Sequence, residues 1–242
     1  MTLFGYWRSI ASRMMRIAAP LVFVACLLVP VRNRFIDLLM VVTLLATLVG
    51  WGIALRKKPR WCAILIFVAL LPVLFLALPS GVNANPKDLG AAYAQSLQRY
   101  LGTQYWWGGE TALGIDCSGL VRAGMMDACL QEGVRTWNAG LCRHALDLWW
   151  HDETAKALGQ GYRNLTTHVA DAASLNALDP SVVQVGDLAV AGDGVHILAY
   201  LGNSRWIQAD PEAGKVIIEA VPSKNPWMKG AVKIVRWNLL KQ

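Results

Sequence analysis

Cys117 stands in the run Asp116-Cys117-Ser118-Gly119-Leu120, which has the composition of a helix start. A thiol attacks only as the thiolate, and a free cysteine has a pKa of about 8.5, so catalysis needs a local device that lowers this pKa. The unpaired N–H groups and the dipole at a helix N-terminus are such a device. Asp116 is a good N-cap for a helix that begins here. The run therefore predicts a nucleophilic thiol exposed at the start of a helix.

A base for this thiol is predicted at His196. This residue opens an apolar strand-like run, 196–201, directly after the glycine-rich turn 192–194, where a side chain can face a cleft. A thiolate–imidazolium pair would activate the attack, and the histidine would later protonate the leaving amine. On the following strand Gln208 and Asp210 alternate onto one face, so either side chain can orient the imidazole. Gln208 is the first choice and Asp210 the second.

The order and content of four segments resemble the NlpC family of bacterial cell-wall cysteine peptidases, which have a papain-like fold. The resemblance covers about residues 87–237. The matching segments are Gly102-Thr103-Gln104-Tyr105-Trp106-Trp107-Gly108-Gly109, Asp116-Cys117-Ser118-Gly119-Leu120-Val121, Gly186-Asp187-Leu188, and His196 through Gly202.

This resemblance implies hydrolysis of an amide bond in peptidoglycan stem peptides, often one that follows D-glutamate, without a metal or organic cofactor. It assigns Cys117 as nucleophile, His196 as base and Gln208 as the polar third member. It also implies that the substrate site is lined by Tyr105, Asp116 and Ser118, with the acid helping to hold a free amine. The chain departs from the family in two ways: the third position is commonly histidine, and the segment between nucleophile and base is long. Residues 137–178 could therefore form a helical cap over the cleft.

The composition indicates that part of the chain lies in a lipid bilayer. Hydrophobic residues make up 55% of the 242 residues and charged residues 16%, against about 25% charged in soluble proteins. Two apolar stretches, 35–55 and 61–79, each approach the roughly 20 residues that a helix needs to cross a bilayer. A shorter stretch, 17–31, contains two prolines, which is compatible with a kinked span or with an interfacial segment, and it is interpreted as a third span.

Basic residues suggest how the chain is oriented. Residues 1–79 hold nine Arg or Lys and one acid, a net charge of +8, whereas residues 80–242 hold 14 basic and 15 acidic residues, a net charge of −1. The basic balance thus belongs to membrane topology and not to a nucleic-acid surface. With a cytoplasmic N-terminus, three spans place the rest of the chain outside the inner membrane of a bacterium, and two spans leave it inside. Arg32 and Arg34 follow the first stretch where a signal peptidase site would lie, so we expect that stretch to be retained.

The remaining sequence predicts an α+β fold, in which N-terminal helices pack on an antiparallel sheet. After a linker at 80–86 comes a hydrolase domain at 87–242. Helical periodicity begins at Lys87, and a second helix is expected from Asp116 or Cys117 to a stop at Gly133. Strand-like runs separated by turns follow, which favours an antiparallel meander. These runs are 182–190, 196–201, 205–209, 216–220 and 232–237.

Other notable residues have structural interpretations. Trp106 and Trp107 are expected in the core, because aromatic side chains dominate burial. A Cys129–Cys142 disulfide remains open. His144, Asp147 and His151 fall near one helical face, but no further metal ligand is evident, and a surface role is favoured over a metal site.

Two other functions remain as alternatives. The membrane anchor is compatible with a thiol acyltransferase or thioesterase that acts on lipids. The neutral Gln208 is compatible with a non-catalytic membrane scaffold or cell-wall-binding module whose triad is degenerate. The leading interpretation is an extracytoplasmic peptidoglycan hydrolase that contacts the lipid bilayer through its anchor.

Overall fold

The computed structural model describes residues 3–241, which form two compact units, one ending at Leu78 and the other beginning at Pro79. The first unit contains three helices, α1 (Leu3–Leu28), α2 (Arg34–Leu55) and α3 (Pro59–Leu76). Among the described residues, α2 and α3 are long and apolar enough to cross a membrane. Their bounds agree closely with the predicted spans at 35–55 and 61–79.

The predicted span at 17–31 is not a separate helix. It forms the second half of α1, which includes Pro20 and ends at Leu28. Among the described residues α1 does not meet the length and hydropathy criterion that α2 and α3 meet. The apolar part of α1 after Arg16 has about 12 helical residues, or about 18 Å, which is short for a bilayer crossing. The two apolar helices give weak support for membrane anchoring and do not by themselves set an orientation.

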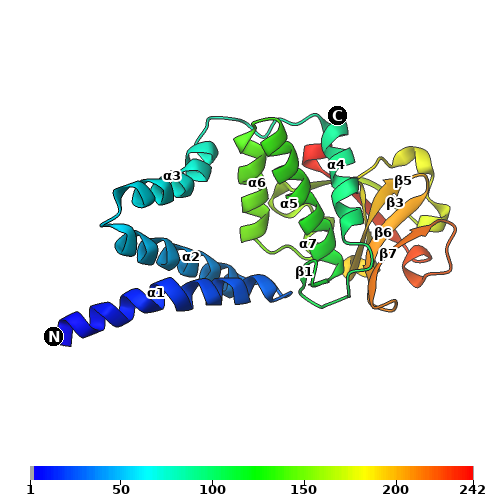
Figure 1. The fold of residues 1–242 in the computed structure, drawn as a ribbon. Coiled ribbons are helices and arrows are strands. Elements are labelled where there is room, and N and C mark those ends of the chain that lie inside the picture. The colour runs from blue at the N-terminus through cyan, green and yellow to red at the C-terminus, as the bar shows by residue number, and fades with distance from the viewer. Residues whose placement is uncertain (1–2, 242) are drawn as a thin grey trace. The chain divides into compact units, whose positions relative to one another are not determined.

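The second unit packs helices beside a mixed-length antiparallel sheet (Figure 1). Helices α4 (Pro86–Arg99), α5 (Cys117–Arg135) and α6 (Ala139–Trp150) lie alongside one another, and α7 (Ala155–Gly159) is short. The sheet has the strand order β3-β8-β4-β5-β6-β7. Its strands are β3 (Thr166–Ala172), β4 (Leu188–Ala191), β5 (His196–Gly202), β6 (Arg205–Asp210), β7 (Lys215–Ala220) and β8 (Val232–Trp237). A small hairpin of β1 (Glu110–Thr111) and β2 (Gly114–Ile115) precedes α5. The predicted α+β class is thereby confirmed.

The meander predicted from the turns is present as β4-β5-β6-β7. The first of its strands is shorter than the predicted run at 182–190, because Gly186 has a φ of +95° and the Asp187 carboxylate accepts the N–H of Gln184, which forms a turn. The buried Asp187 also binds Arg236 of β8 through two hydrogen bonds of 2.7 Å. The turn at Gly186-Asp187 therefore ends the loop before β4, and Asp187 links the start of β4 to β8.

The core lies on both faces of the sheet. On the face covered by helices, Leu89, Tyr93 and Leu97 of α4 are fully buried, as their three- and four-residue spacing predicts. They pack with apolar residues of α5 and of the sheet. On the opposite face a second cluster includes Trp206 and Met228. This second cluster covers the strands that carry the candidate base and its partner.

The structure differs from the sequence-based expectation at two places. Helix α5 continues past Gly133 to Arg135; Gly133 is needed because α6 passes so close that a Cβ there would lie 2.6 Å from Cys142 Sγ. The stretch 137–178 is not a purely helical insertion, since it contains the edge strand β3 as well as α6 and α7. Helix α6 packs against α5, so this stretch is part of the domain's core.

Candidate active site

Cys117 is the first residue of α5, and Asp116 caps that helix. One oxygen of Asp116 accepts the N–H of Gly119 at 2.7 Å and the Ser118 hydroxyl at 3.0 Å. Its other oxygen accepts the N–H of Gly108 at 2.8 Å. The predicted N-cap is thus present, and it also binds the preceding loop to the helix start.

The thiol lies against the start of β5. Cys117 Sγ is 4.0 Å from the carbonyl oxygen of Val195, the residue directly before His196. Contrary to the exposed position expected from sequence, Cys117 is only 7% exposed. Burial raises its pKa to about 12, and the negative charge of Asp116 adds to this shift. The backbone N–H groups of Ile197, Ser118 and Cys117 lower the pKa, but their effect is smaller. The helix start therefore does not hold a thiolate in the free protein, because burial outweighs it.

His196 and Gln208 are directly hydrogen-bonded. His196 Nε2 is 2.7 Å from Gln208 Oε1, and both side chains are buried. Burial lowers the pKa of His196, and the bond to Gln208 opposes that shift. Because the carbonyl oxygen of the amide only accepts, the imidazole carries its proton on Nε2 and leaves Nδ1 as the basic nitrogen. Thiol and imidazole are therefore both favoured in their neutral forms.

Asp210, the second-choice partner, is engaged elsewhere. Its Oδ1 accepts the N–H groups of Glu212 and Ala213, and its Oδ2 accepts the Asn225 side-chain amide at 2.7 Å. Its charge nevertheless raises the pKa of His196, against the larger effect of burial, which lowers it. The geometry thus pairs the histidine with Gln208, while Asp210 organises the β6–β7 turn and the segment around Asn225.

Tyr105, Asp116 and Ser118 are brought together beside the thiol. The half-buried Tyr105 has its pKa raised to about 12, first by burial and then by its electrostatic interactions with the neighbouring Cys117 and Asp116 side chains. Its N–H donates to Gly214, which fixes the loop along β7. An ionised carboxylate offers about four lone-pair positions, and three donors already occupy Asp116, so about one position is left for another donor.

Trp106 and Trp107 are not core residues, contrary to the expectation from sequence. They are 54% and 79% exposed and follow Tyr105 directly. The backbone of this loop turns tightly through Gly108 and Gly109 toward the start of α5, which leaves the indoles outside the packed interior. Two exposed apolar side chains thus belong to the loop that contacts Asp116, the N-cap of α5.

The close approach of loop and helix explains two glycines. A Cβ on Gly119 would lie 2.1 Å from the carbonyl oxygen of Gly109, and a Cβ on Gly109 would lie 2.5 Å from that of Gly114. Neither site can accept a side chain without moving backbone. The glycine after Cys117-Ser118 is therefore required by the packing of the helix start.

A buried charged network around Arg122 was not found from the sequence. Arg122 Nη1 lies 2.8 Å from Glu110 Oε1, and its Nε lies 3.2 Å from Glu153 Oε2. Arg122 also donates to the carbonyl oxygens of Leu148 and His151. It thereby joins α5, the β1 hairpin and the segment after α6. The sequence around Arg122, five residues after Cys117, gives no signal for such a role.

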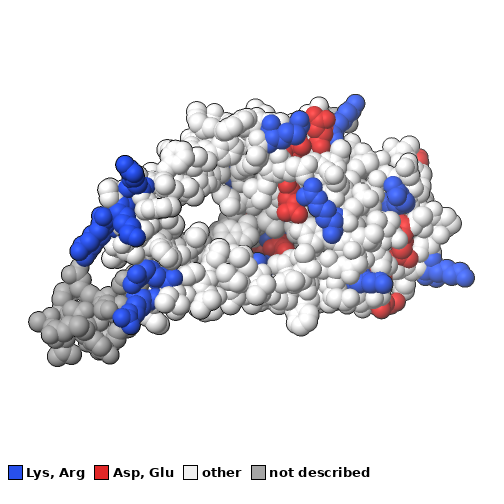
Figure 2. All heavy atoms as spheres, viewed as in Figure 1, with Lys and Arg blue, Asp and Glu red and all other residues white. Residues whose placement is uncertain are grey.

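His151, directly after α6, and the two cysteines Cys129 and Cys142 make other contacts in the structure. Among the described residues no group of three or more His, Cys, Asp or Glu side chains is arranged to hold a metal ion. His151 instead pairs with Asp147 at 3.2 Å, and Asp147 binds Arg163. Cys129 and Cys142 are buried free thiols and form no disulfide. Basic and acidic side chains lie interspersed on the visible face of the second unit (Figure 2), in agreement with the absence of a basic footprint in its sequence.

Comparisons with known proteins identify the family of this chain. The family model described as NlpC/P60 family matches residues 102–236, more than half of the chain. Similar solved structures include NlpC2 from Trichomonas vaginalis, with 18% identity and a TM-score of 0.42 over 64% of this chain and 50% of that one. The peptidoglycan hydrolase RipB from Mycobacterium tuberculosis has 23% identity and a TM-score of 0.40 over 62% of this chain and 66% of that one.

The P60 domain of an antigen from M. avium subspecies paratuberculosis has 20% identity and a TM-score of 0.40, over 65% of this chain and 98% of that domain. This chain therefore spans about half of the Trichomonas protein and nearly all of the mycobacterial domain. No curated protein matches the chain significantly. The match of the family model to residues 102–236, which include Cys117, His196 and Gln208, establishes that the chain belongs to the NlpC/P60 family.

Proposed function

We propose that this protein is a membrane-anchored thiol hydrolase that cleaves amide bonds in peptidoglycan stem peptides. Cys117 is the nucleophile, His196 the base and Gln208 the residue that orients the base. The observation that carries the proposal is the junction of α5 and β5, where the buried thiol lies 4.0 Å from the carbonyl before His196 and the imidazole is hydrogen-bonded to Gln208 at 2.7 Å.

The neutral forms of both groups define the order of events. His196 Nδ1 removes the thiol proton as Cys117 Sγ attacks the substrate carbonyl, so that thiolate is formed only during the reaction. The N–H groups at the start of α5 stabilise the negative charge that develops on the carbonyl oxygen. The tetrahedral species then collapses, the C–N bond breaks, and His196 gives the proton to the leaving amine. Water, deprotonated by His196, hydrolyses the resulting thioester and regenerates the thiol.

The substrate is held by the cluster beside the nucleophile. The remaining acceptor position on Asp116 would bind the free amine of a stem peptide, assisted by the Tyr105 and Ser118 hydroxyls. Ser118 already donates to Asp116, so its own oxygen remains free to accept from that amine. The two exposed indoles, Trp106 and Trp107, offer apolar surface for the rest of the substrate.

We propose that the hydrolase domain is extracytoplasmic, because its substrate is outside the inner membrane. Helices α2 and α3 span the bilayer. The apolar part of α1 after Arg16 is short for a crossing, but the whole helix has 26 residues, or about 39 Å, and long basic side chains extend toward the interface, so α1 supplies a third crossing with a cytoplasmic N-terminus. The basic turn between α2 and α3 then also faces inward. Alkaline phosphatase fused after residue 242 should therefore be active. An inactive phosphatase fusion together with an active cytoplasmic reporter would reverse this orientation.

The hydrolase itself is tested with purified muropeptides. The full chain in detergent should release new peptide fragments, identified by mass spectrometry, and Cys117→Ala should release none. Leu130→Ala, which changes an exposed residue on the same helix, is the matched control and should retain activity. Equal product from the wild type and Cys117→Ala would refute the proposed function.

A further inference from the structure

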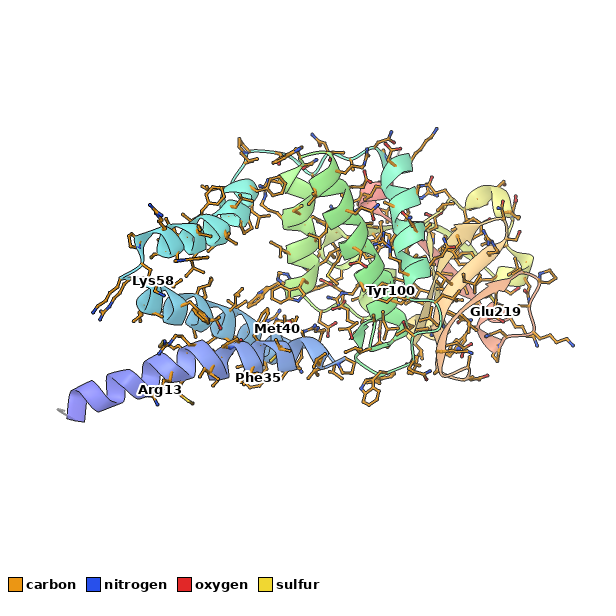
Figure 3. The ribbon with its side chains drawn as sticks, viewed as in Figure 1. Arg13, Phe35, Met40, Lys58, Tyr100 and Glu219 are labelled. Carbon is orange, nitrogen blue, oxygen red and sulfur yellow. The ribbon has the colours of Figure 1, made fainter. Side chains whose placement is uncertain are left out.

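Gln208, the hydrogen-bond partner of His196, is itself bound to a glutamate. Gln208 Nε2 donates to Glu219 Oε2 at 2.8 Å, while Gln208 Oε1 faces His196. Glu219 lies on β7, diagonally across from Gln208 on the same face of the sheet, since Gln208 pairs with Ile217. Figure 3 marks Glu219 on this strand. Gln208 is completely buried, so its amide has no alternative partner in water.

The Glu219 carboxylate selects one of the two possible orientations of the Gln208 amide. The two ends of an amide have nearly the same shape, and a rotation of 180° would present the NH₂ group instead of the oxygen to the imidazole. Such a rotation would favour the tautomer with its proton on Nδ1, which could not accept the thiol proton. A carboxylate only accepts hydrogen bonds, so it requires the NH₂ group to point toward Glu219 and the oxygen toward His196.

The acid is also fixed in place. Glu219 Oε1 accepts the hydroxyl of Ser223 at 3.1 Å, and Ser223 Oγ accepts the N–H of Asn225. Asn225 in turn donates to Asp210 and accepts the N–H of Trp227. The indole of Trp227 stacks on His196, which closes a ring of contacts around the imidazole. Glu219 is therefore part of a built arrangement and not a surface acid that meets Gln208 by chance.

We propose that Glu219 is a positioning residue that, through the amide of Gln208, holds His196 in the tautomer with Nδ1 free to deprotonate Cys117. This inference rests on the proposed triad and adds the residue that determines how its neutral third member works. It also explains how glutamine serves where the family commonly has histidine: Glu219 on β7 fixes the orientation of the Gln208 amide, so that its oxygen faces His196.

An exchange of the two side chains tests the inference. In Glu219→Gln the second amide can donate as well as accept, so Gln208 is free to rotate, and we expect kcat to fall by about tenfold or more with little change in KM. This is less than the roughly 10⁴-fold loss expected when the residue that directly orients a catalytic histidine is changed. In Gln208→Glu two carboxylates face each other, and kcat should fall as well. In the double variant Gln208→Glu/Glu219→Gln, the new carboxylate at position 208 accepts from His196, and the new amide at position 219 on β7 donates to that carboxylate. The double variant should therefore recover most of the lost rate.

The matched control is Glu212→Gln, which changes an exposed acid on the β6–β7 turn of the same hairpin and should leave kcat unchanged. The rate of Cys117 alkylation by iodoacetamide is measured in all variants, because it needs no peptidoglycan. The ¹⁵N chemical shifts of the His196 ring in the full chain in micelles, assigned by their loss in His196→Gln, report the tautomer directly. We expect the Nε2-protonated form in the wild type and the double variant, and a mixture in Glu219→Gln.

The outcomes separate the two proposals. A wild-type tautomer and alkylation rate in Glu219→Gln, or a double variant no better than either single variant, would overturn the role of Glu219. Loss of fold in a single variant would appear in circular dichroism, and the double variant then decides the question. If the tautomer and alkylation data follow the expected cycle but muropeptides are not cleaved by the wild type, the positioning role stands and the substrate is wrong.

Discussion

The indole of Trp227 stacks on the imidazole of His196, with ring centroids 4.3 Å apart and planes inclined by 23°. The histidine is 2% exposed, and burial is the main cause of its lowered pKa. The backbone of Trp227 is held by Asn225, which Asp210 binds. A residue that looked like a candidate triad member in the sequence thus supports the cover over the base.

Removal of this cover should shift the pH dependence of the reaction. A lowered pKa keeps the imidazole neutral and basic below pH 6.5, the ordinary pKa of histidine, so in the wild type kcat/KM falls only in more acidic solution. Trp227→Leu admits water, raises the pKa of His196 toward 6.5 and moves this fall to higher pH. The pH profile and an NMR titration of His196 measure the shift; an unchanged midpoint would show that the stack does not control desolvation. Trp150→Leu, at a partly exposed site on α6, is the control.

Loss of Arg122 should destabilise the fold. Arg122→Met leaves the buried carboxylates of Glu110 and Glu153 without this guanidinium, and removal of one partner of a buried ion pair costs about 3–5 kcal/mol. Thermal unfolding of the full chain in detergent measures the effect. Arg135→Met removes an ion pair on the same helix in which Glu132 is buried but the Arg135 side chain is 57% exposed, so the midpoint should fall less than in Arg122→Met. Equal shifts in the two variants would exclude a special role for the network.

A methyl group at Gly119 should disturb the position of the active-site loop. Gly119→Ala places a Cβ 2.1 Å from the Gly109 carbonyl oxygen, so the loop must move away from the helix start and displace Tyr105 and the Asp116 cap. We expect kcat/KM to fall at least about tenfold, because small misplacements at a reaction centre are costly. Gly230→Ala, where nothing lies within 4 Å of the added Cβ, should behave like the wild type. Full activity in Gly119→Ala would mean that the loop does not position the substrate.

The exposed indole of Trp107 should contribute to substrate binding. Trp107→Ala removes a side chain that is 79% exposed, so folding should be unaffected. We expect KM for muropeptides to rise a few-fold, with kcat nearly constant, because binding contacts away from the reacting atoms act on both ground and transition states. Steady-state kinetics of Trp107→Ala and of the equally exposed Trp137→Ala compare the loop with a remote site. A KM equal to that of the wild type would assign Trp107 no contact with substrate.

Local signals in the sequence predicted the elements that hold the site, but not the environment of its residues. The cap and apolar periodicity of α5 are local, and so is the alternation that places Gln208 and Asp210 on one face of β6. The burial of Cys117 depends on a loop 78 residues later, at Val195, and therefore reversed the predicted direction of its pKa shift. The choice between Gln208 and Asp210 depends on how Glu219 and Asn225 approach from β7 and the following segment.

Strand β3 was missed for a related reason. Its residues, Thr166–Ala172, combine polar and apolar side chains without regular alternation, because this edge strand pairs only with β8 and contains a register shift between His168 and Ala170. The predicted strand at 182–190 was too long because its apolar residues hide the turn at Gly186-Asp187. Only the pairing of Asp187 with Arg236, far along the chain, shows why that turn is needed.

The position of β8 between β3 and β4 bears on how the protein is made. Both neighbours are complete by Ala191, but the strand that joins them begins at Val232. On a ribosome that synthesises the chain from its N-terminus, β3 and β4 would therefore each have an unpaired edge until the last strand has emerged, and open edges invite wrong pairing with other chains. His196 and Gln208 lie on the strands that extend the same sheet from β4, so we expect hydrolytic activity to arise only after synthesis of this domain is complete.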